Sequence, residues 1–295
     1  MSTVGIIGLG NMGRGMATAL IGAGFQVATV TRSSQSRSRP LPAGLEVRDS
    51  MAALLAQAEV VLLSLPDPQT VVQVVEGPDG IRAHGRAGLI VIDTTTSEPA
   101  STRRIAADLA ERNISFVDAP VSGAPALAHQ GKLTVMAGGT PAQLERAGPV
   151  LNAIAARVFH VGPSGAGHMA KLANNLMAAA HLLVAEEVVA LAEAAGMERA
   201  RFLEIVNASS GRSFVTERVY PDWILDGRFD LGFSIRLMRK DVRLAIQAAQ
   251  RMPVFLPMVA AAATRWLDNS REIDDDEDVT FVAELTRRRM QAEAT

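Results

Sequence analysis

With 295 residues, 48% of them apolar, the chain is longer than one compact α/β core usually requires, so its length favours two domains. Its 29 Lys and Arg against 31 Asp and Glu give a formal charge of -2 and no basic face, which argues against a nucleic-acid partner. Cysteine is absent, which excludes disulfides, thiolate metal sites and a cysteine nucleophile. The N-terminus enters a strand pattern without a cationic and apolar leader, so we expect a cytoplasmic protein.

Six short apolar runs alternate with helical patterns through the first half of the chain. They span residues 3–8, 26–31, 60–65, 89–93, 115–117 and 133–137, and Gly, Pro, Asp and Ser bound them. Such runs are typical of buried parallel strands joined by crossover helices. We predict an α/β domain over residues 1–162, built on a doubly wound parallel sheet.

A glycine-rich segment follows the first strand. It reads Gly8-Leu9-Gly10-Asn11-Met12-Gly13, a GxGxxG pattern that precedes a helical pattern. In this strand-to-helix context the first glycine allows the tight turn, the second lets a diphosphate approach the backbone, and the third permits close helix packing. The segment therefore predicts a dinucleotide site; the alternative is a glycine-rich turn that binds nothing.

The end of the second strand bears on the choice of cofactor. An NAD-selective site usually carries Asp or Glu there for the ribose 2'-hydroxyl, but this chain has Thr31-Arg32-Ser33-Ser34, with Arg37 and Arg39 close behind. Guanidinium and hydroxyl groups suit a 2'-phosphate. We predict that Arg32 contacts the cofactor and that NADP is preferred, with NAD as the alternative.

The second half of the chain has a different pattern. After Gly162-Pro163, Ser164 is a candidate helix cap, and apolar residues recur at helical spacing from Met169 to Ala195. Such a helix of roughly 30 residues is about 45 Å long, and four polar residues (His181, Glu186, Glu187, Glu193) make its apolar stretch a poor membrane span. We predict an all-helical domain over residues 163–295, with a second long helix over 234–252.

Lys171 is the first candidate catalytic group. Only three lysines, Lys132, Lys171 and Lys240, stand among the 29 cationic residues. A lysine can lose its proton, whereas a guanidinium cannot. Lys171 and Asn175 lie one helical turn apart, so both side chains can address the same ligand.

Two more segments complete a set of four motifs. Asp118-Ala119-Pro120-Val121-Ser122-Gly123 follows the fifth strand, and Gly165-Ala166-Gly167 precedes Lys171 and Asn175. Together with the glycine-rich turn and Lys240-Asp241, these segments make almost the whole chain resemble the β-hydroxyacid dehydrogenases, of which 3-hydroxyisobutyrate dehydrogenase is the best-known member. The resemblance implies a Rossmann-like N-terminal domain and a helical C-terminal domain, like that of 6-phosphogluconate dehydrogenase, that supplies oligomer contacts.

The resemblance also assigns roles to individual residues. Lys171 would be the catalytic acid or base, Ser122 and Gly123 would hold a substrate carboxylate, and Asn175 would orient the substrate. Lys240 would lie near both nicotinamide and substrate, and Leu65 and Thr96 would contact the cofactor. The chemistry is consistent, because hydride transfer to an aldehyde leaves an alkoxide that needs a proton donor. A lysine serves if desolvation and a neighbouring cation, such as Lys240, lower its pKa.

Two departures leave alternatives open. Ala124 stands where many members of the family have a second Gly, which affects the carboxylate pocket, and Thr31-Arg32-Ser33 replaces the frequent Asn-Arg-Thr of NADP-using members. The default substrate is 3-hydroxyisobutyrate; tartronate semialdehyde, succinic semialdehyde, glyoxylate, sulfolactaldehyde and L-serine remain alternatives. An imine reductase, whose relatives generally lack this lysine, and a non-catalytic nucleotide-binding protein are the rival functions. We expect no metal, and a homodimer or homotetramer, because so long a helix needs more cover than one small domain provides.

Overall fold

The computed structural model describes residues 3–30, 40–268, 272–285 and 287–288. The chain divides into two compact units, Met1–Lys171 and Leu172–Thr295, and each is described by itself. The predicted cofactor contact Arg32 lies outside the described residues.

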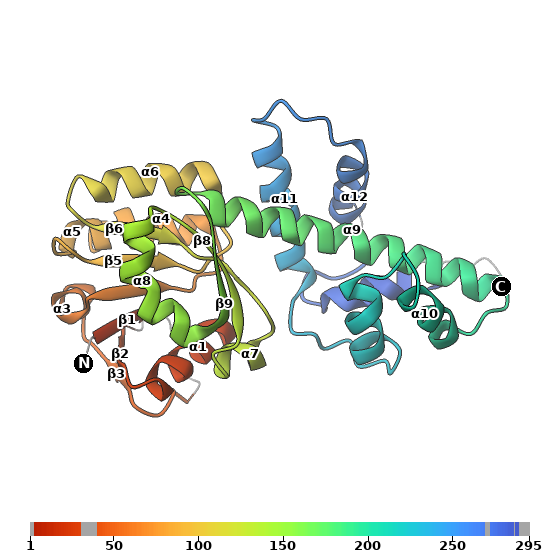
Figure 1. The fold of residues 1–295 in the computed structure, drawn as a ribbon, viewed down its shortest axis with the longest axis horizontal. Helices are drawn as coiled ribbons and strands as arrows, with labels where there is room; N and C mark the ends of the chain where they lie inside the picture. The colour runs from red at the N-terminus through yellow and green to blue at the C-terminus, as the bar shows by residue number, and fades with distance from the viewer. Residues whose placement is uncertain (1–2, 31–39, 269–271, 286, 289–295) are drawn as a thin grey trace. The chain divides into compact units, whose positions relative to one another are not determined.

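The first unit is built on one sheet, which has nine strands among the described residues (Figure 1). Its order is β3-β2-β1-β4-β5-β6-β8-β7, with β9 paired to β8. The strands are β1 (Thr3–Ile7), β2 (Gln26–Thr29), β3 (Leu45–Val47), β4 (Val60–Leu63), β5 (Ile90–Asp93), β6 (Ser115–Asp118), β7 (Val121–Ser122), β8 (Leu133–Gly138) and β9 (Ala155–Gly162). All six predicted strands are present.

The prediction of a parallel sheet is wrong for the strand at residues 133–137, which is β8 in the structure. The strands from β3 to β6 are parallel, as expected, but β8 runs antiparallel to both β6 and β7. The chain reverses between Ser122 and Leu133 through the short helix α7 (Pro125–His129). That connection lacks a full crossover helix, which a parallel pair requires, so the strand returns in the opposite direction.

Helices cover both faces of this sheet (Figure 1). Alternate residues of β4 show the doubly wound arrangement: Val60 and Leu62 pack in one core cluster, and Val61 and Leu63 in another. The first cluster is closed by α1 (Asn11–Gly22), α7 and α8 (Pro141–Ile154), and the second by α3 (Met51–Gln57), α4 (Pro68–Glu76), α5 (Ile81–His84) and α6 (Pro99–Ala110). Burial on both faces explains why these strands have continuous apolar sequences.

The second unit is helical. It contains most of α9 (Ala166–Ala194), followed by α10 (Arg199–Asn207), the π-helical η1 (Val215–Ile224), α11 (Ile235–Ala249), α12 (Pro257–Asp268) and the 3₁₀ helix η3 (Val279–Glu284). The two long helices predicted from periodicity are confirmed, and Ser234 caps α11 by accepting from the Leu237 N–H at 3.4 Å. Fully buried Trp266 ties α12 to α9, because its Nε1 donates to the Ala179 carbonyl at 3.0 Å.

Of the described helices, α9 alone is long and apolar enough, by length and composition, to cross a membrane. Half of its most apolar window is buried inside the structure. A core helix of a folded domain passes the same test.

Candidate active site

The glycine-rich turn joins β1 to α1, and two of its glycines are required by the protein backbone itself. Gly8 has a φ of 99°, and a Cβ there would lie 2.0 Å from the Ser64 carbonyl oxygen. A Cβ on Gly13 would lie 1.9 Å from the Gly8 carbonyl oxygen. These contacts agree with the expected tight turn and close packing of helix on strand.

Gly10 differs from its two neighbours. A Cβ at this position would meet no protein atom within 4 Å, so packing within the chain does not explain the glycine. Gly10 is also the N-cap of α1 and makes no side-chain cap hydrogen bond. The N-terminus of α1 therefore has no N-cap side chain and has room beside Gly10, an arrangement that fits an anion such as a diphosphate.

The remaining residues of the turn contribute differently. Asn11 is exposed and Met12 half-buried, whereas the Leu9 side chain is buried in the core. The Leu9 carbonyl accepts a hydrogen bond from Arg14 Nε at 2.9 Å. Leu9 can therefore contact a cofactor through its backbone, but its side chain belongs to the core.

The loops after β4 and β5 lie together at the carboxyl edge of the sheet. The Leu65 N–H donates to Thr95 Oγ1 at 3.1 Å, and the Thr94 hydroxyl donates to the Leu63 carbonyl at 2.6 Å. Leu65 and Thr96 are half-buried. Leu65 and Thr96 therefore lie at the edge where open α/β sheets bind their ligands, and their contact with a nucleotide stays a prediction.

Ser122 and Gly123 lie at the end of β7. Ser122 pairs with Thr134 of β8, and Gly123 has a φ of 133°, which favours glycine. The following helix α7 packs tightly on α1, since a Cβ on Gly15 would lie 2.7 Å from the Ala128 Cβ. The predicted carboxylate loop therefore leads into a helix that packs directly on the helix of the glycine-rich turn.

Ala124, the departure from the family pattern, is the N-cap of α7 with a φ of -72°. Any residue adopts this conformation without strain. Ala124 is therefore unstrained and places a methyl group next to Gly123.

Lys171 is half-buried on the second turn of α9. The start of this helix is not capped as the sequence suggested: the Ser164 hydroxyl is buried without a hydrogen-bond partner among the described residues. Asp118, at the end of β6, accepts instead from the N–H groups of Gly165 at 2.8 Å and His168 at 3.0 Å. Burial raises the pKa of the Asp118 carboxyl, although these N–H bonds act in the opposite direction.

Asn175 and Lys240 are brought together by Asp241, which sequence reasoning did not single out. The Asn175 Nδ2 donates to Asp241 Oδ2 at 2.6 Å, and Lys240 Nζ lies 3.1 Å from Asp241 Oδ1. Asp241 is 2% exposed. This carboxylate fixes the Asn175 amide and offsets the charge of Lys240, which the sequence suggested as the cation that lowers the pKa of Lys171. In the sequence, only its position next to Lys240 in the family motif pointed to Asp241.

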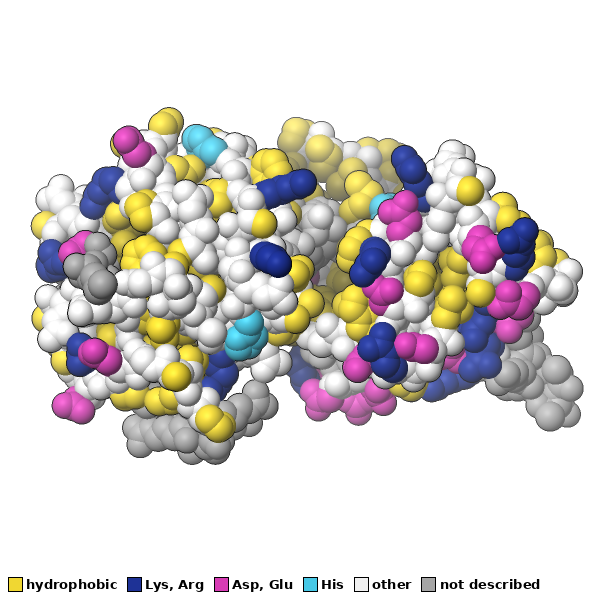
Figure 2. Space-filling view, turned by 60° about the horizontal axis from the view of Figure 1, so that its bottom comes forward, with side chains coloured by type: hydrophobic (Ala, Val, Ile, Leu, Met, Phe, Trp, Pro, Cys, Tyr) yellow, Lys and Arg dark blue, Asp and Glu magenta, His cyan; other side chains and the backbone are white. Residues whose placement is uncertain are grey.

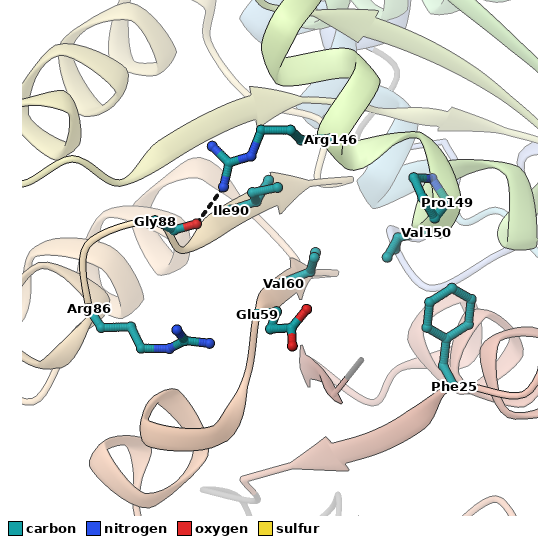
Figure 3. A pocket seen from close by; sticks show the side chains of 9 residues that line it. All are labelled: Phe25, Glu59, Val60, Arg86, Gly88, Ile90, Arg146, Pro149 and Val150. Carbon is teal, nitrogen blue, oxygen red and sulfur yellow. Dashed lines mark hydrogen bonds between the residues drawn. The ribbon is translucent and has the colours of Figure 1, made fainter. Parts of the chain in front are cut away.

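A separate pocket lies at the opposite edge of the sheet (Figure 3). Its volume is about 290 Å³, and Glu59, Val60 and Ile90, at the amino ends of β4 and β5, line it together with Arg86 and Arg146. Arg146 already donates to the Gly88 carbonyl at 2.6 Å. Because nucleotides bind beyond the carboxyl ends of parallel strands, we do not place the active site there. Among the described residues, no three His, Cys, Asp or Glu side chains form a group that could hold a metal ion.

Comparison with known proteins agrees with this geometry over both units. Residues 3–162 match the NAD binding domain of 6-phosphogluconate dehydrogenase, and residues 165–286 match the NAD-binding domain of NADP-dependent 3-hydroxyisobutyrate dehydrogenase. The NAD-dependent L-serine dehydrogenase of Pseudomonas aeruginosa is 36% identical over 89% of this chain and 90% of its own length. The 2-(hydroxymethyl)glutarate dehydrogenase of Eubacterium barkeri is 34% identical over 88% and 86%. The structure of Mycobacterium tuberculosis 3-hydroxyisobutyrate dehydrogenase with L-serine has a TM-score of 0.88 at 29% identity and covers 97% of this chain and 99% of its own.

The fold, the glycine-rich turn open to a diphosphate and these matches define an NAD(P)-dependent dehydrogenase that acts on CH–OH donors. The chain belongs to the 3-hydroxyisobutyrate dehydrogenase family of β-hydroxyacid dehydrogenases.

Proposed function

We propose that this enzyme interconverts a small β-hydroxyacid and its semialdehyde, with 3-hydroxyisobutyrate as the default substrate and NADP(H) as the preferred cofactor. The observation that carries the proposal is the orientation of the Asn175 amide. Asn175 lies one helical turn after Lys171 on α9, and buried Asp241 accepts a hydrogen bond from its amide group. A site with an ammonium and an oriented amide on one helix face suits a substrate with an oxygen that gains or loses a proton. We assign residues 1–162 to a nucleotide-binding domain and residues 163–295 to a substrate and oligomerisation domain.

The nicotinamide, when bound, supplies or accepts the hydride. In the reducing direction Lys171 donates a proton from Nζ to the oxygen of the aldehyde carbon as that oxygen becomes an alkoxide, and in the oxidising direction Nζ accepts the hydroxyl proton. Asn175, whose amide group is oriented by Asp241, hydrogen-bonds the substrate and keeps that oxygen within reach. Lys240, which forms an ion pair with Asp241, is assigned to the binding of nicotinamide and substrate from the family resemblance.

The substrate carboxylate is assigned to Ser122 and Gly123. A backbone N–H and a serine hydroxyl at the end of β7 are suitable donors to an anion. The direct packing of α7 on α1 supports this role, because it holds the carboxylate loop beside the helix that follows the glycine-rich turn.

Arg32 supports NADP over NAD, since a guanidinium binds the 2'-phosphate and no acid is available for the 2'-hydroxyl. The comparisons include both cofactors: the matching serine dehydrogenase is NAD-dependent, and the C-terminal family is described by an NADP-dependent enzyme. Substitution of Arg32 by Ala should raise KM for NADP and leave KM for NAD within about twofold. An equal loss for both cofactors would contradict the assignment.

The substrate itself is tested by initial rates. The panel contains 3-hydroxyisobutyrate, L-serine, 2-(hydroxymethyl)glutarate, tartronate semialdehyde, succinic semialdehyde, glyoxylate and sulfolactaldehyde, each with NADP(H) and NAD(H). Saturable turnover of a three- or four-carbon β-hydroxyacid pair supports the proposal. A cyclic imine is assayed beside the panel. Turnover of the imine and of no panel member would favour the imine reductase hypothesis, and tight nucleotide binding without any turnover would favour a non-catalytic protein.

We further propose that the chain self-associates through α9. Four apolar side chains, Met177, Val184, Val188 and Leu191, are between 41% and 69% exposed and recur on one side of the helix. Hydrophobic side chains also reach the surface on the face drawn in Figure 2. Sedimentation velocity should therefore find a dimer or tetramer, and Leu191→Glu should shift it toward monomer; a monomeric wild type would refute this.

A further inference from the structure

The first turn of α9 rests on the end of β6. Asp118 Oδ1 accepts from the Gly165 N–H at 2.8 Å, and Oδ2 accepts from the His168 N–H at 3.0 Å. Asp118 is fully buried. A carboxylate from a strand distant in the sequence thus replaces the local N-cap, and its two hydrogen bonds attach the first turn of α9 to the end of β6.

Two glycines make this approach possible. A Cβ on Gly138 would lie 2.6 Å from either Asp118 carboxylate oxygen, and a Cβ on Gly167 would lie 2.4 Å from the Met136 carbonyl oxygen. Gly167, the second glycine of the Gly-x-Gly before Lys171, therefore serves backbone packing within the protein.

His168 provides a second attachment for the same turn. Its ring is fully buried, with Nδ1 2.6 Å from Thr102 Oγ1 on α6 and Nε2 3.8 Å from Asp93 Oδ2 at the end of β5. The Thr102 hydroxyl also lies 3.0 Å from the Glu98 carbonyl. The ring is therefore hydrogen-bonded to α6 through Nδ1, while Nε2 faces the Asp93 carboxylate at the end of β5 beyond hydrogen-bond distance.

These attachments join the segments that carry the proposed site. Asp93 Oδ1 accepts from the Thr95 N–H at 3.0 Å and so holds the loop that contains Thr96. Asp118 directly precedes the loop that contains Ser122. His168, which both aspartates engage, precedes Lys171 by three residues, slightly less than one helical turn.

We propose that His168 is a positioning residue: through its contacts with Asp93 and Thr102 it sets the direction of the first turn of α9 and thereby the place of Lys171 Nζ relative to the loops after β5 and β6. The chemical part of this inference rests on the function proposed for Lys171, but the placement of the lysine does not.

The choice of residue types supports a positioning role. Burying an imidazole and a carboxylate costs free energy unless their polar atoms are paired, whereas apolar residues would fill the same volume without that cost. The short hydrogen bond between Thr102 and Nδ1 restricts the orientation of the ring, and hydride transfer is sensitive to errors of about 1 Å in the placement of a catalytic group.

A matched pair of variants at Thr102 tests the inference. Thr102→Val is nearly isosteric but removes the hydroxyl that contacts His168, and Thr102→Ser keeps it. We expect Thr102→Val to lower kcat about 10- to 100-fold, with KM for the cofactor changed by less than about twofold. Thr102→Ser should recover most of kcat. His168→Asn, which removes the ring edge that faces Asp93, should show the same loss of kcat.

The lysines provide a readout that does not depend on turnover. The chain has only three, Lys132, Lys171 and Lys240, so protein with ¹³C-labelled lysine gives three side-chain Cε–Hε signals, assigned with single Lys→Arg variants. Thr102→Val and His168→Asn should shift or broaden the Lys171 signal and leave the Lys132 signal unchanged, and Thr102→Ser should preserve the wild-type spectrum.

An unchanged Lys171 signal in folded Thr102→Val and His168→Asn would overturn the inference, as would equal behaviour of the Val and Ser variants. A shifted Lys171 signal in an enzyme that turns over none of the substrates would support the positioning and refute the proposed function, so the two failures are distinguishable.

Discussion

Gly10→Ala separates cofactor binding from folding. The added Cβ meets no protein atom within 4 Å, and the backbone φ of -68° is one that alanine adopts freely. Alanine is a poorer N-cap than glycine by about 1 kcal/mol, and this cost is largely offset because alanine reduces the conformational entropy of the unfolded chain by about 0.4–1 kcal/mol. We therefore expect the free energy of unfolding to change by less than about 0.5 kcal/mol.

The same methyl group occupies the space that a bound diphosphate needs. Losing one or two N–H bonds to a charged group costs about 1.5–3 kcal/mol, which corresponds to a rise in cofactor Kd of about 10- to 150-fold. Titration of NADPH fluorescence with the wild type and the variant measures this rise directly.

Gly13→Ala is the matched control. Its Cβ would lie 1.9 Å from the Gly8 carbonyl oxygen, so the backbone must move and stability should fall by about 1–3 kcal/mol. In a unit of this size that loss lowers Tm by about 2–12 °C. If Gly10→Ala binds NADPH with wild-type affinity, or if its Tm is as low as that of Gly13→Ala, then Gly10 does not serve to make room for the diphosphate.

Three further predictions follow from the contacts of single side chains. Asp241→Asn keeps the shape but removes the carboxylate that holds Asn175 and Lys240; we expect kcat/KM for the substrate to fall about 10- to 100-fold with NADPH affinity unchanged, and a rise in cofactor Kd alone would contradict this. The pKa of Asp118 is raised above 3.8 by burial, so its contribution to stability is fully present below pH 3.8, decreases as pH rises through the native pKa, and is constant above it. In urea unfolding across pH 3.5 to 8, the free energy of unfolding of the wild type relative to that of Asp118→Asn should therefore fall as pH rises. A rise of the wild type relative to Asp118→Asn with pH would contradict this prediction. Arg146→Ala removes a residue of the pocket at the amino edge of the sheet and should leave NADPH affinity and turnover unchanged, whereas a loss of either would move the site toward that edge.

The buried strands were predictable because their physics is local. Val60 to Leu63 packs into clusters on both faces of the sheet, and burial on two sides leaves a continuous apolar run in the sequence. By contrast, β9 is mostly exposed and β7 has only two residues, so neither gives a run that can be recognised. The antiparallel direction of β8 depends on the reversal at α7, which apolar periodicity does not encode.

The site divides in the same way. The glycine-rich turn was predictable because strand, glycines and helix adjoin in the sequence. The two carboxylates that hold the site residues, Asp118 and Asp241, were not predictable, because their contacts join residues far apart in the sequence. Asp118 is 47 residues from Gly165, and Asn175 is 66 residues from Asp241. Ser164 was the reasonable local choice for a helix cap, and a strand end folded against the helix displaced it.

Lys171 is the proposed catalytic group, and substitution of this residue tests that role. Lys171→Ala and Lys171→Arg are compared with the wild type for NADPH affinity and for turnover of the best substrate in the panel. Loss of a general acid or base should lower kcat by about 10²- to 10⁴-fold, Arg should not restore it because a guanidinium does not release its proton, and NADPH affinity should remain unchanged. Turnover within a few-fold of the wild type in Lys171→Ala would contradict the proposed mechanism.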